Sequence, residues 1–114
     1  MGTNDFTHER AAPMKAILNG IVLAEAPRDE LVKIEGNWYF PPRSVDSALL
    51  IASAKPYTCG WKGRCQYFSV NDGGGNLLPD RAFSYPDPYP ASLERVGQDY
   101  SNYVAFWKEI QITE

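Results

Sequence analysis

Histidine and cysteine are scarce in this sequence, which limits the chemistry it can support. The only histidine is His8, and the only cysteines are Cys59 and Cys65. Residues 1–13 are polar and aperiodic, so we expect a flexible N-terminal leader that keeps His8 away from any folded site. Because a thiol nucleophile is usually activated by a histidine, this arrangement disfavours catalysis by a cysteine and histidine pair.

Long apolar runs and an excess of positive charge are also missing. No segment approaches the roughly 20 apolar residues that a membrane-spanning helix needs, and the N-terminus lacks the pattern of a signal peptide. We therefore expect a cytoplasmic protein with no membrane partner and with free thiols rather than a disulfide. The net charge is −3 and the cations are scattered, so we expect no nucleic-acid partner.

The length and the composition indicate one ordered domain built from short elements. A chain of 114 residues can bury a single core. Nine prolines and nine glycines interrupt the chain too often for long helices. We therefore expect a single β-rich domain over residues 14–114.

The first half of this domain has the patterns of antiparallel strands. Two apolar runs between Met14 and Glu25 are joined by Asn19-Gly20, the dipeptide best suited to a tight hairpin turn. Residues 31–35 alternate apolar and polar side chains, which predicts a half-buried strand. Residues 38–40 form a short aromatic strand, and residues 44–50 have a capping serine and helical spacing, which predicts a two-turn helix.

The second half continues with strands and turns. From Trp61, alternation predicts that the side chains of Trp61, Gly63, Cys65, Tyr67 and Ser69 share one face of a strand. Residues 71–76 are rich in glycine and asparagine and predict a flexible turn before a strand at residues 82–85. A helical turn at residues 91–96 and closing strands at 100–108 and 110–113 complete a mainly β domain of about seven or eight strands with one or two short helices.

A series of motifs in this order resembles the bacterial family labelled domain of unknown function 427. The motifs are Met14-Lys15-Ala16, Asn19-Gly20, Val22-Leu23-Ala24-Glu25, Glu35-Gly36-Asn37 with Tyr39-Phe40-Pro41, Cys59-x-Trp61-Lys62-Gly63 with Tyr67, Tyr85-Pro86-Asp87-Pro88 and Val104-Ala105-Phe106-Trp107. The resemblance runs from about Met14 to the C-terminus. It departs from the family pattern at Gly60, where proline is usual, and at Cys65, where a small residue such as alanine is usual.

The resemblance implies an Mss4-like or β-tent fold, in which two antiparallel sheets splay apart and hold a groove between them. Several relatives of that fold bind zinc through two Cys-x-x-Cys pairs. This chain has only Cys59 and Cys65, so we expect no metal and no cofactor.

The stretch from Pro56 to Tyr67 combines both cysteines with aromatic and cationic side chains, and we expect it to border a ligand groove. The main hypothesis is that the domain binds a small organic molecule in an aromatic-lined groove, with Lys62 supplying charge. The residues expected to bind the ligand are Glu35, Asn37, Tyr39, Trp61, Lys62, Tyr67, Tyr85 and Asp87.

Two other classes of function stay open. Cys59 lies near Lys62 and Arg64 in sequence, and neighbouring cations favour the thiolate, so an enzyme with Cys59 as its catalytic residue is one alternative. A protein-interaction module that uses exposed aromatic residues is the other. The sequence is compatible with a monomer or a homodimer.

Overall fold

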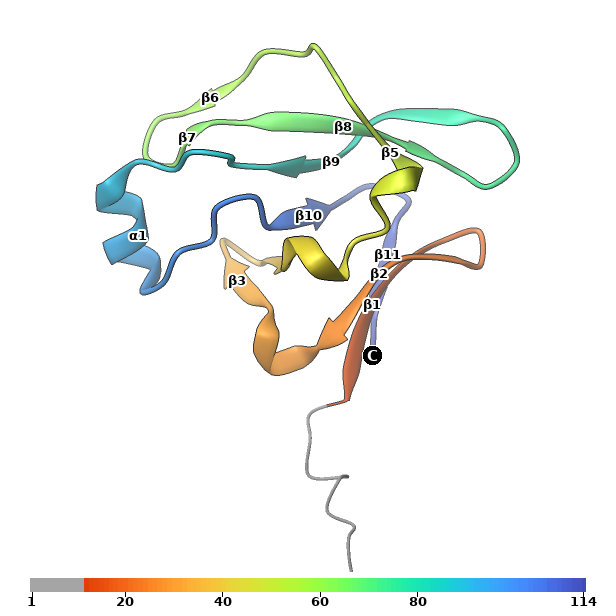
Figure 1. Ribbon diagram of the computed structural model, residues 1–114, viewed down its shortest axis with the longest axis horizontal. Coiled ribbons are helices and arrows are strands. Elements are labelled where there is room, and N and C mark those ends of the chain that lie inside the picture. The colour runs from red at the N-terminus through yellow and green to blue at the C-terminus, as the bar shows by residue number, and fades with distance from the viewer. Residues whose placement is uncertain (1–11) are drawn as a thin grey trace, which may run out of the picture.

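The strands of this chain form antiparallel sheets, as Figure 1 shows for the computed structural model, which describes residues 12–114. One sheet has the strand order β11 (Gln111–Thr113), β1 (Pro13–Leu18), β2 (Ile21–Pro27). A six-stranded sheet has the order β3 (Val32–Ile34), β4 (Asn37–Phe40), β10 (Val104–Phe106), β9 (Leu77–Ser84), β8 (Gln66–Asn71), β5 (Leu50–Ala52). A small third sheet pairs β6 (Thr58–Cys59) with β7 (Gly63–Arg64). The expected mainly β, antiparallel class is confirmed.

Two tight turns depend on residues with positive φ angles. Asn19 and Gly20 have φ angles of 51° and 79° and join β1 to β2, as the sequence predicted. Glu35 and Gly36 repeat this geometry between β3 and β4, with φ angles of 54° and 85°. Two successive positive φ angles give the turn whose twist matches that of a hairpin. The second turn places Glu35 at the tip of its hairpin.

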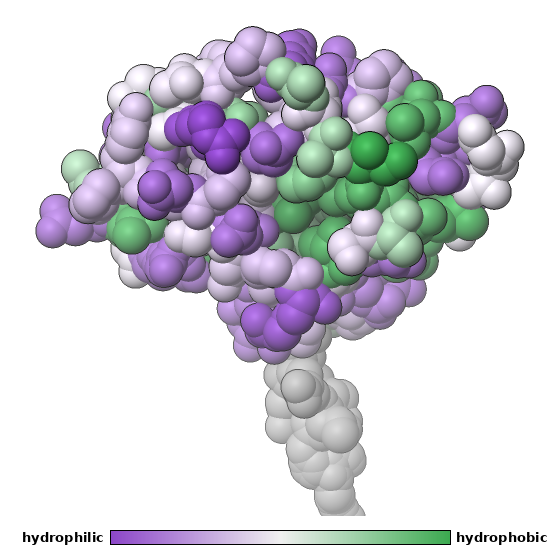
Figure 2. Space-filling model, turned by 45° about the horizontal axis from the view of Figure 1, so that its top comes forward, coloured by the Kyte–Doolittle hydropathy of each residue, from purple (hydrophilic) through white to green (hydrophobic). Residues whose placement is uncertain are grey.

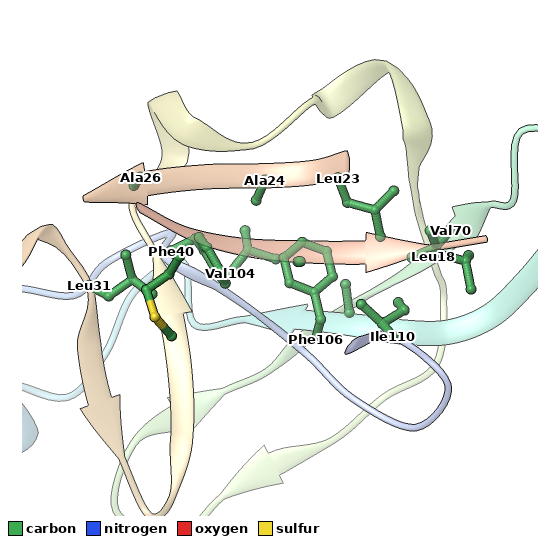
Figure 3. Close-up of a cluster of buried hydrophobic side chains, with 13 residues drawn as sticks. Leu18, Leu23, Ala24, Ala26, Leu31, Phe40, Val70, Val104, Phe106 and Ile110 are labelled. Atoms are coloured by element: carbon green, nitrogen blue, oxygen red, sulfur yellow. The ribbon is translucent and has the colours of Figure 1, made fainter. Parts of the chain in front are cut away.

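The main hydrophobic core fills the space between the three-stranded and six-stranded sheets (Figure 3). Leu18 and Leu23 enter it from β1 and β2, and Phe40, Val104 and Phe106 enter it from the larger sheet. The rings of Phe40 and Phe106 meet edge to face at 5.8 Å. Edge-to-face contact between aromatic rings is a favourable arrangement in a core.

The six-stranded sheet buries a second cluster on its opposite face. Tyr39, Phe83 and Ala105 are cross-strand neighbours and alternate along their strands with residues of the main core. Cys65 and Tyr100 pack in the same cluster. The segment from Cys59 onward therefore lies on the face turned away from the three-stranded sheet, and not between the two sheets as the resemblance implied.

The only α-helix in the described part of the chain is α1 (Pro90–Val96), where a helical turn was expected. The prediction of a helix at residues 44–50 is wrong. Its place is taken by two 3₁₀ turns, η3 (Pro42–Ser44) and η4 (Ser47–Leu49). Val45 forms a β-bridge with Ala24, and this pairing interrupts the helical path. A further 3₁₀ turn, η2 (Arg28–Glu30), links β2 to β3.

Alternation along the stretch from Trp61 is only partly as expected. The chain turns at Gly60–Lys62 and becomes a strand at Gly63. Because this turn breaks the alternation, Lys62 is not simply opposite to Trp61 on a strand, and its side chain is buried with its Nζ 4.9 Å from the centre of the Tyr85 ring. Cys65 and Tyr67 do share the expected face and pack in the second cluster.

Two expectations concern the N-terminus and the membrane. Of the expected leader, only Ala12 and Pro13 belong to the described residues, and Pro13 already starts β1. His8 lies outside the described residues. Within residues 12–114, we find no helix with the length and apolar character to cross a membrane.

Candidate functional site

Three segments meet around Trp61, on the side of the molecule where α1 and the β6–β7 hairpin lie in Figure 1. They are the β3–β4 turn, the β6–β7 turn and α1. The backbone N–H of Tyr89, just before the helix, donates to the carbonyl of Lys62 at 3.0 Å. A Cβ at Gly63 would lie 3.4 Å from the carbonyl oxygen of Asp87. That contact is an ordinary one, and glycine is favoured at this position because its φ angle is 114°, a conformation that other residues rarely adopt.

A partly buried ion pair connects two of these segments. The Nζ of Lys62 lies 2.6 Å from Oε1 of Glu35, and the two side chains are 5% and 52% exposed. The Nε1–H of Trp61 donates to the other carboxylate oxygen of Glu35 at 3.3 Å. The hydrogen bond from Lys62 holds the pKa of Glu35 below its usual value. Glu35 is therefore a carboxylate at neutral pH and aligns both Lys62 and Trp61.

Cations also contact the aromatic rings. The Nζ of Lys62 lies 4.9 Å from the centre of the Tyr85 ring and 5.3 Å from that of Trp61. The guanidinium carbon of Arg95, on α1, lies 4.1 Å from the centre of the Trp61 ring. Such contacts are attractive because the face of an aromatic ring carries partial negative charge. Together with Glu35, they fix the orientation of the Trp61 ring.

Two surface depressions adjoin this ring. One has a volume of about 250 Å³ and is lined by Lys33, Ile34, Glu35, Trp61, Arg95 and Val96. The other has a volume of about 300 Å³ and is lined by Gly60, Trp61, Tyr89, Ala91, Ser92 and Arg95. Trp61 and Arg95 line both depressions. We call the first one the Lys33 depression and the second one the Tyr89 depression.

Buried tyrosines form the interior side of the site. Tyr39 is fully buried, and its hydroxyl has no hydrogen-bond partner among the described residues. The ring of Tyr100 contacts those of Tyr39 and Tyr85 at 6.2 and 6.4 Å, and its hydroxyl donates to the Oγ of Ser92 at 3.0 Å. Burial raises the pKa of Tyr39 and of Tyr85. These phenols are therefore protonated at neutral pH and serve as packing.

The cysteines lie in the same cluster as free thiols. Cys65 is buried, and burial raises the pKa of its thiol. Cys59 is half-buried and packs against the second cluster. The described residues contain no group of three or more histidine, cysteine, aspartate or glutamate side chains placed to hold a metal ion.

The structure thus brings together Glu35, Trp61, Lys62 and Tyr85, which the sequence singled out. Tyr39 lies behind them in the second cluster. The other three expected ligand residues are placed differently. They make no contact with the ion pair, and neither depression at Trp61 is lined by Asn37, Tyr67 or Asp87. Of all the expected ligand residues, Glu35 and Trp61 line a depression, whereas Tyr39, Lys62 and Tyr85 lie behind them.

Tyr67 lies in another part of the second cluster, which we call the Tyr67 group. Its ring stacks on that of Trp107 with 6.4 Å between centres, and it also contacts Tyr57. The ammonium of Lys55 lies 5.2 Å from the centre of the Tyr67 ring. Asn37 begins β4 opposite Ile34, and Asp87 is exposed.

Among the lining residues that the sequence did not single out, two are charged, namely Lys33 and Arg95. Lys33 occupies the exposed position of the alternating strand β3, two residues before Glu35. Arg95 lies in the last turn of α1. Exposed cations at such positions usually mean solvated surface, so no sequence pattern distinguished them.

Comparison with known proteins places this arrangement in a family. The model of the family described as domain of unknown function (DUF427) matches residues 7–113, which includes every residue of the site. No curated protein matches the chain. The match spans nearly the whole sequence. This chain belongs to the DUF427 family.

Proposed function

We propose that this domain binds a small organic molecule at Trp61, in the two depressions that adjoin its ring. The observation that supports the proposal is the fixed and partly exposed indole, which is held by Glu35, Lys62 and Arg95 and borders both depressions. Small-molecule sites commonly combine aromatic walls with a few placed polar groups. A preorganised ring of this kind binds a planar group with little loss of side-chain freedom.

In this proposal the residues have different tasks. Trp61 offers the contact surface, and Arg95 lies at the boundary of the two depressions. Lys62 acts mainly as a positioning residue, because its charge is compensated by Glu35 at 2.6 Å and its side chain is buried. We therefore expect the positive charge of Lys62 to be neutralised by Glu35 and not to act on the ligand.

A screen of small metabolites by thermal shift, followed by amide NMR titration of the binders, tests the proposal. A compound present at 100 times its dissociation constant stabilises the fold by about 2.7 kcal/mol, which such a screen detects. Binding should move the resonances of Trp61 and its neighbours, and Trp61→Ala should abolish it. Trp107→Ala is the matched control, because this indole lies in the Tyr67 group and lines neither depression. Binders that leave the Trp61 resonances unmoved would refute the proposal.

A second candidate is a protein-interaction module. Val22, Ile51 and Leu77 are at least 40% exposed. Figure 2 shows apolar side chains gathered on the side where Figure 1 places the tips of the β1–β2 and β8–β9 hairpins. These tips are close together, since a Cβ at Gly73 would lie 3.0 Å from Ile21. Light scattering tests this candidate: a stable dimer that Ile51→Lys disrupts would support it, and a monomer at high concentration would exclude self-association.

A further inference from the structure

We infer that the domain has a second small-molecule site, which takes an uncharged ligand with a compact apolar body and one hydroxyl or carbonyl group. The site is a depression of about 240 Å³ on the main-core face of the six-stranded sheet, opposite to the face that carries Trp61. We call it the Ser84 depression. It is lined by Pro42, Val45, Ser47, Leu50, Phe68, Ser84, Asn102 and Val104. The inference does not depend on binding at Trp61, because the two sites share no lining residue.

The path of the chain between β4 and β5 explains why this depression exists. These strands lie on different sides of the six-stranded sheet, so residues 41–49 must cross its face (yellow in Figure 1). The crossing segment is anchored to the other sheet, since Val45 forms a β-bridge with Ala24. Next to this bridge, the N–H of Asp46 donates to the carbonyl of Leu23 at 2.8 Å. Because the segment follows the edge of β2, a gap remains between it and strands β8, β9 and β10.

Both walls of the depression are fixed by the fold. The floor consists of Phe68, Ser84 and Val104 on three adjacent strands, and Ser84 is the cross-strand partner of Val104. The roof contains Pro42, whose ring restricts the backbone, and the two 3₁₀ turns η3 and η4. A site with such walls binds a ligand with little loss of conformational freedom.

The lining predicts an uncharged ligand with an apolar body. Within residues 12–114, none of the side chains that line the Ser84 depression is charged. An ionised ligand would lose water there without gaining a partner of opposite charge, which is costly. An apolar cavity of about 150 Å³ is enough for benzene, so the volume of about 240 Å³ has room for one ring with a short substituent. The apolar lining residues are Pro42, Val45, Leu50, Phe68 and Val104.

Ser84 provides the polar contact at the floor of the depression. The buried polar or charged side chains of the described residues are Lys62, Ser84 and Ser92. Lys62 is paired with Glu35. Ser92 donates to the carbonyl of Tyr89. Ser84 is 2% exposed, and its side chain forms no hydrogen bond within residues 12–114.

This lack of a partner distinguishes the Ser84 hydroxyl from an ordinary buried serine. The large majority of buried polar groups have a hydrogen-bond partner. In the described part of the chain, the unpartnered atoms sealed from solvent belong to Tyr39 and Asp80, so the Ser84 hydroxyl is not sealed and can reach a ligand. A hydroxyl donates to a carbonyl and accepts from another hydroxyl. Ser47 and Asn102 line the same depression as exposed polar residues.

Probes of the same shape that differ in polarity test the inference. Benzyl alcohol, benzylamine and ethylbenzene share a ring and a two-atom substituent, which ends in a hydroxyl, a charged ammonium and a methyl group respectively. Amide NMR titration of the full chain at neutral pH follows their binding. We expect benzyl alcohol to move the resonances of Ser84, Phe68 and Leu50, and to bind at least about tenfold more tightly than benzylamine, whose charge has no partner there. Trp61→Ala should leave this binding unchanged.

Variants of Ser84 assign the polar contact. Ser84→Ala should weaken benzyl alcohol by about threefold to tenfold and should not weaken ethylbenzene, because only the alcohol loses a hydrogen bond. Ser84→Thr keeps a hydroxyl and should retain more of the affinity for the alcohol. Ser69→Ala is the matched control, since Ser69 lies on β8, accepts from the N–H of Asp80 and does not line the depression. We expect its affinity for both probes to equal that of the natural protein.

The outcomes separate this site from the one at Trp61. Benzyl alcohol binding that Ser84→Ala weakens and Trp61→Ala does not would support the inference. If none of the probes moves the resonances of the lining residues, or if they move only those around Trp61, the second site is overturned and the proposed function is unaffected. Equal affinity for benzylamine and benzyl alcohol would overturn the uncharged class of ligand. Equal loss of benzyl alcohol and ethylbenzene in Ser84→Ala would overturn the role of the hydroxyl.

Discussion

Lys62 and Glu35 form an ion pair whose two partners differ sharply in their access to water. The ammonium and the carboxylate oxygen are 2.6 Å apart, yet Lys62 is 5% exposed and Glu35 is 52% exposed. The carboxylate can be solvated without its partner, whereas the ammonium would be left in an apolar cluster. Removing one partner should therefore have a different effect from removing the other.

Glu35→Gln should destabilise the fold by about 1–2 kcal/mol at neutral pH. The variant leaves the ammonium of Lys62 buried with only an amide oxygen to accept its hydrogen bond, and the exposure of Glu35 moderates the cost. Urea unfolding measures the change. Glu30→Gln serves as the control, because Glu30 pairs with Arg43 on the surface and its loss should cost less than about 0.5 kcal/mol.

The same pair predicts a dependence on pH. Lys62 lowers the pKa of Glu35 below its ordinary value of 4.5, so the folded state binds this proton less readily than the unfolded state. The stabilisation is fully present above pH 4.5 and is lost as the pH falls through the folded-state pKa. The stability difference between the natural protein and Glu35→Gln should therefore shrink in acid. A difference that stays constant from pH 7 to pH 3 would contradict this.

Lys62→Met should change the stability by less than about 1 kcal/mol. Methionine retains most of the side-chain volume, removes the buried charge and leaves Glu35 free to be hydrated. The contacts of the ammonium with Tyr85 and Trp61 are lost, which offsets part of the gain. Urea unfolding of this variant beside Glu35→Gln provides the comparison. A loss above about 3 kcal/mol would show that the ion pair itself holds the site together.

Tyr39→Phe should stabilise the protein or leave it unchanged. The hydroxyl of Tyr39 is buried without a partner among the described residues, and removing it relieves a desolvation cost of about 1 kcal/mol. Tyr100→Phe is the matched control, because this hydroxyl donates to Ser92 and its loss should cost about 1 kcal/mol. Thermal and urea unfolding of both variants would distinguish the two phenols. Equal destabilisation would indicate that a buried water satisfies Tyr39.

Thiol labelling tests the hypothesis of a catalytic cysteine. Under native conditions Cys59 should react faster than Cys65, since Cys59 is half-buried and burial both shields the thiol of Cys65 and raises its pKa. Cys59→Ser and Cys65→Ser assign the two rates. Rapid labelling of Cys59, faster than that of a free thiol in solution, would favour the enzyme. Labelling of Cys59 only on unfolding would end that hypothesis.

The sequence predicted the structure well where short-range backbone preferences determine it, as they do at tight turns. Asn19-Gly20 predicted a tight turn from its preference for positive φ angles, and the structure has it. The Glu35-Gly36 turn has the same geometry, although the alternating pattern predicted Glu35 as the last residue of a strand. Residues 44–50 had helical spacing, but pairing of Val45 with Ala24 across the domain overrides this local preference.

The site was harder to predict because it depends on three segments that are distant in sequence. Glu35, Trp61 and Tyr85 were identified as individual residues of the right kind. Their contacts follow from the turn at Gly60–Lys62, which buries Lys62 against the alternation of the neighbouring strand. Arg95 becomes relevant only because α1 packs beside that turn, which no local pattern encodes.

The pairing of β1 with β11 has a consequence for folding. Lys15 lies opposite Thr113, so the central strand of the three-stranded sheet has one neighbour that is local and one that comes from the far end of the chain. Contacts with such a large sequence separation form slowly, because a long loop must close before they are gained. During synthesis, the β1–β2 hairpin would leave one edge unpaired until the last strand has left the ribosome. Nascent chains stalled before residue 111 should therefore be more sensitive to proteases and more prone to aggregate than chains that include β11.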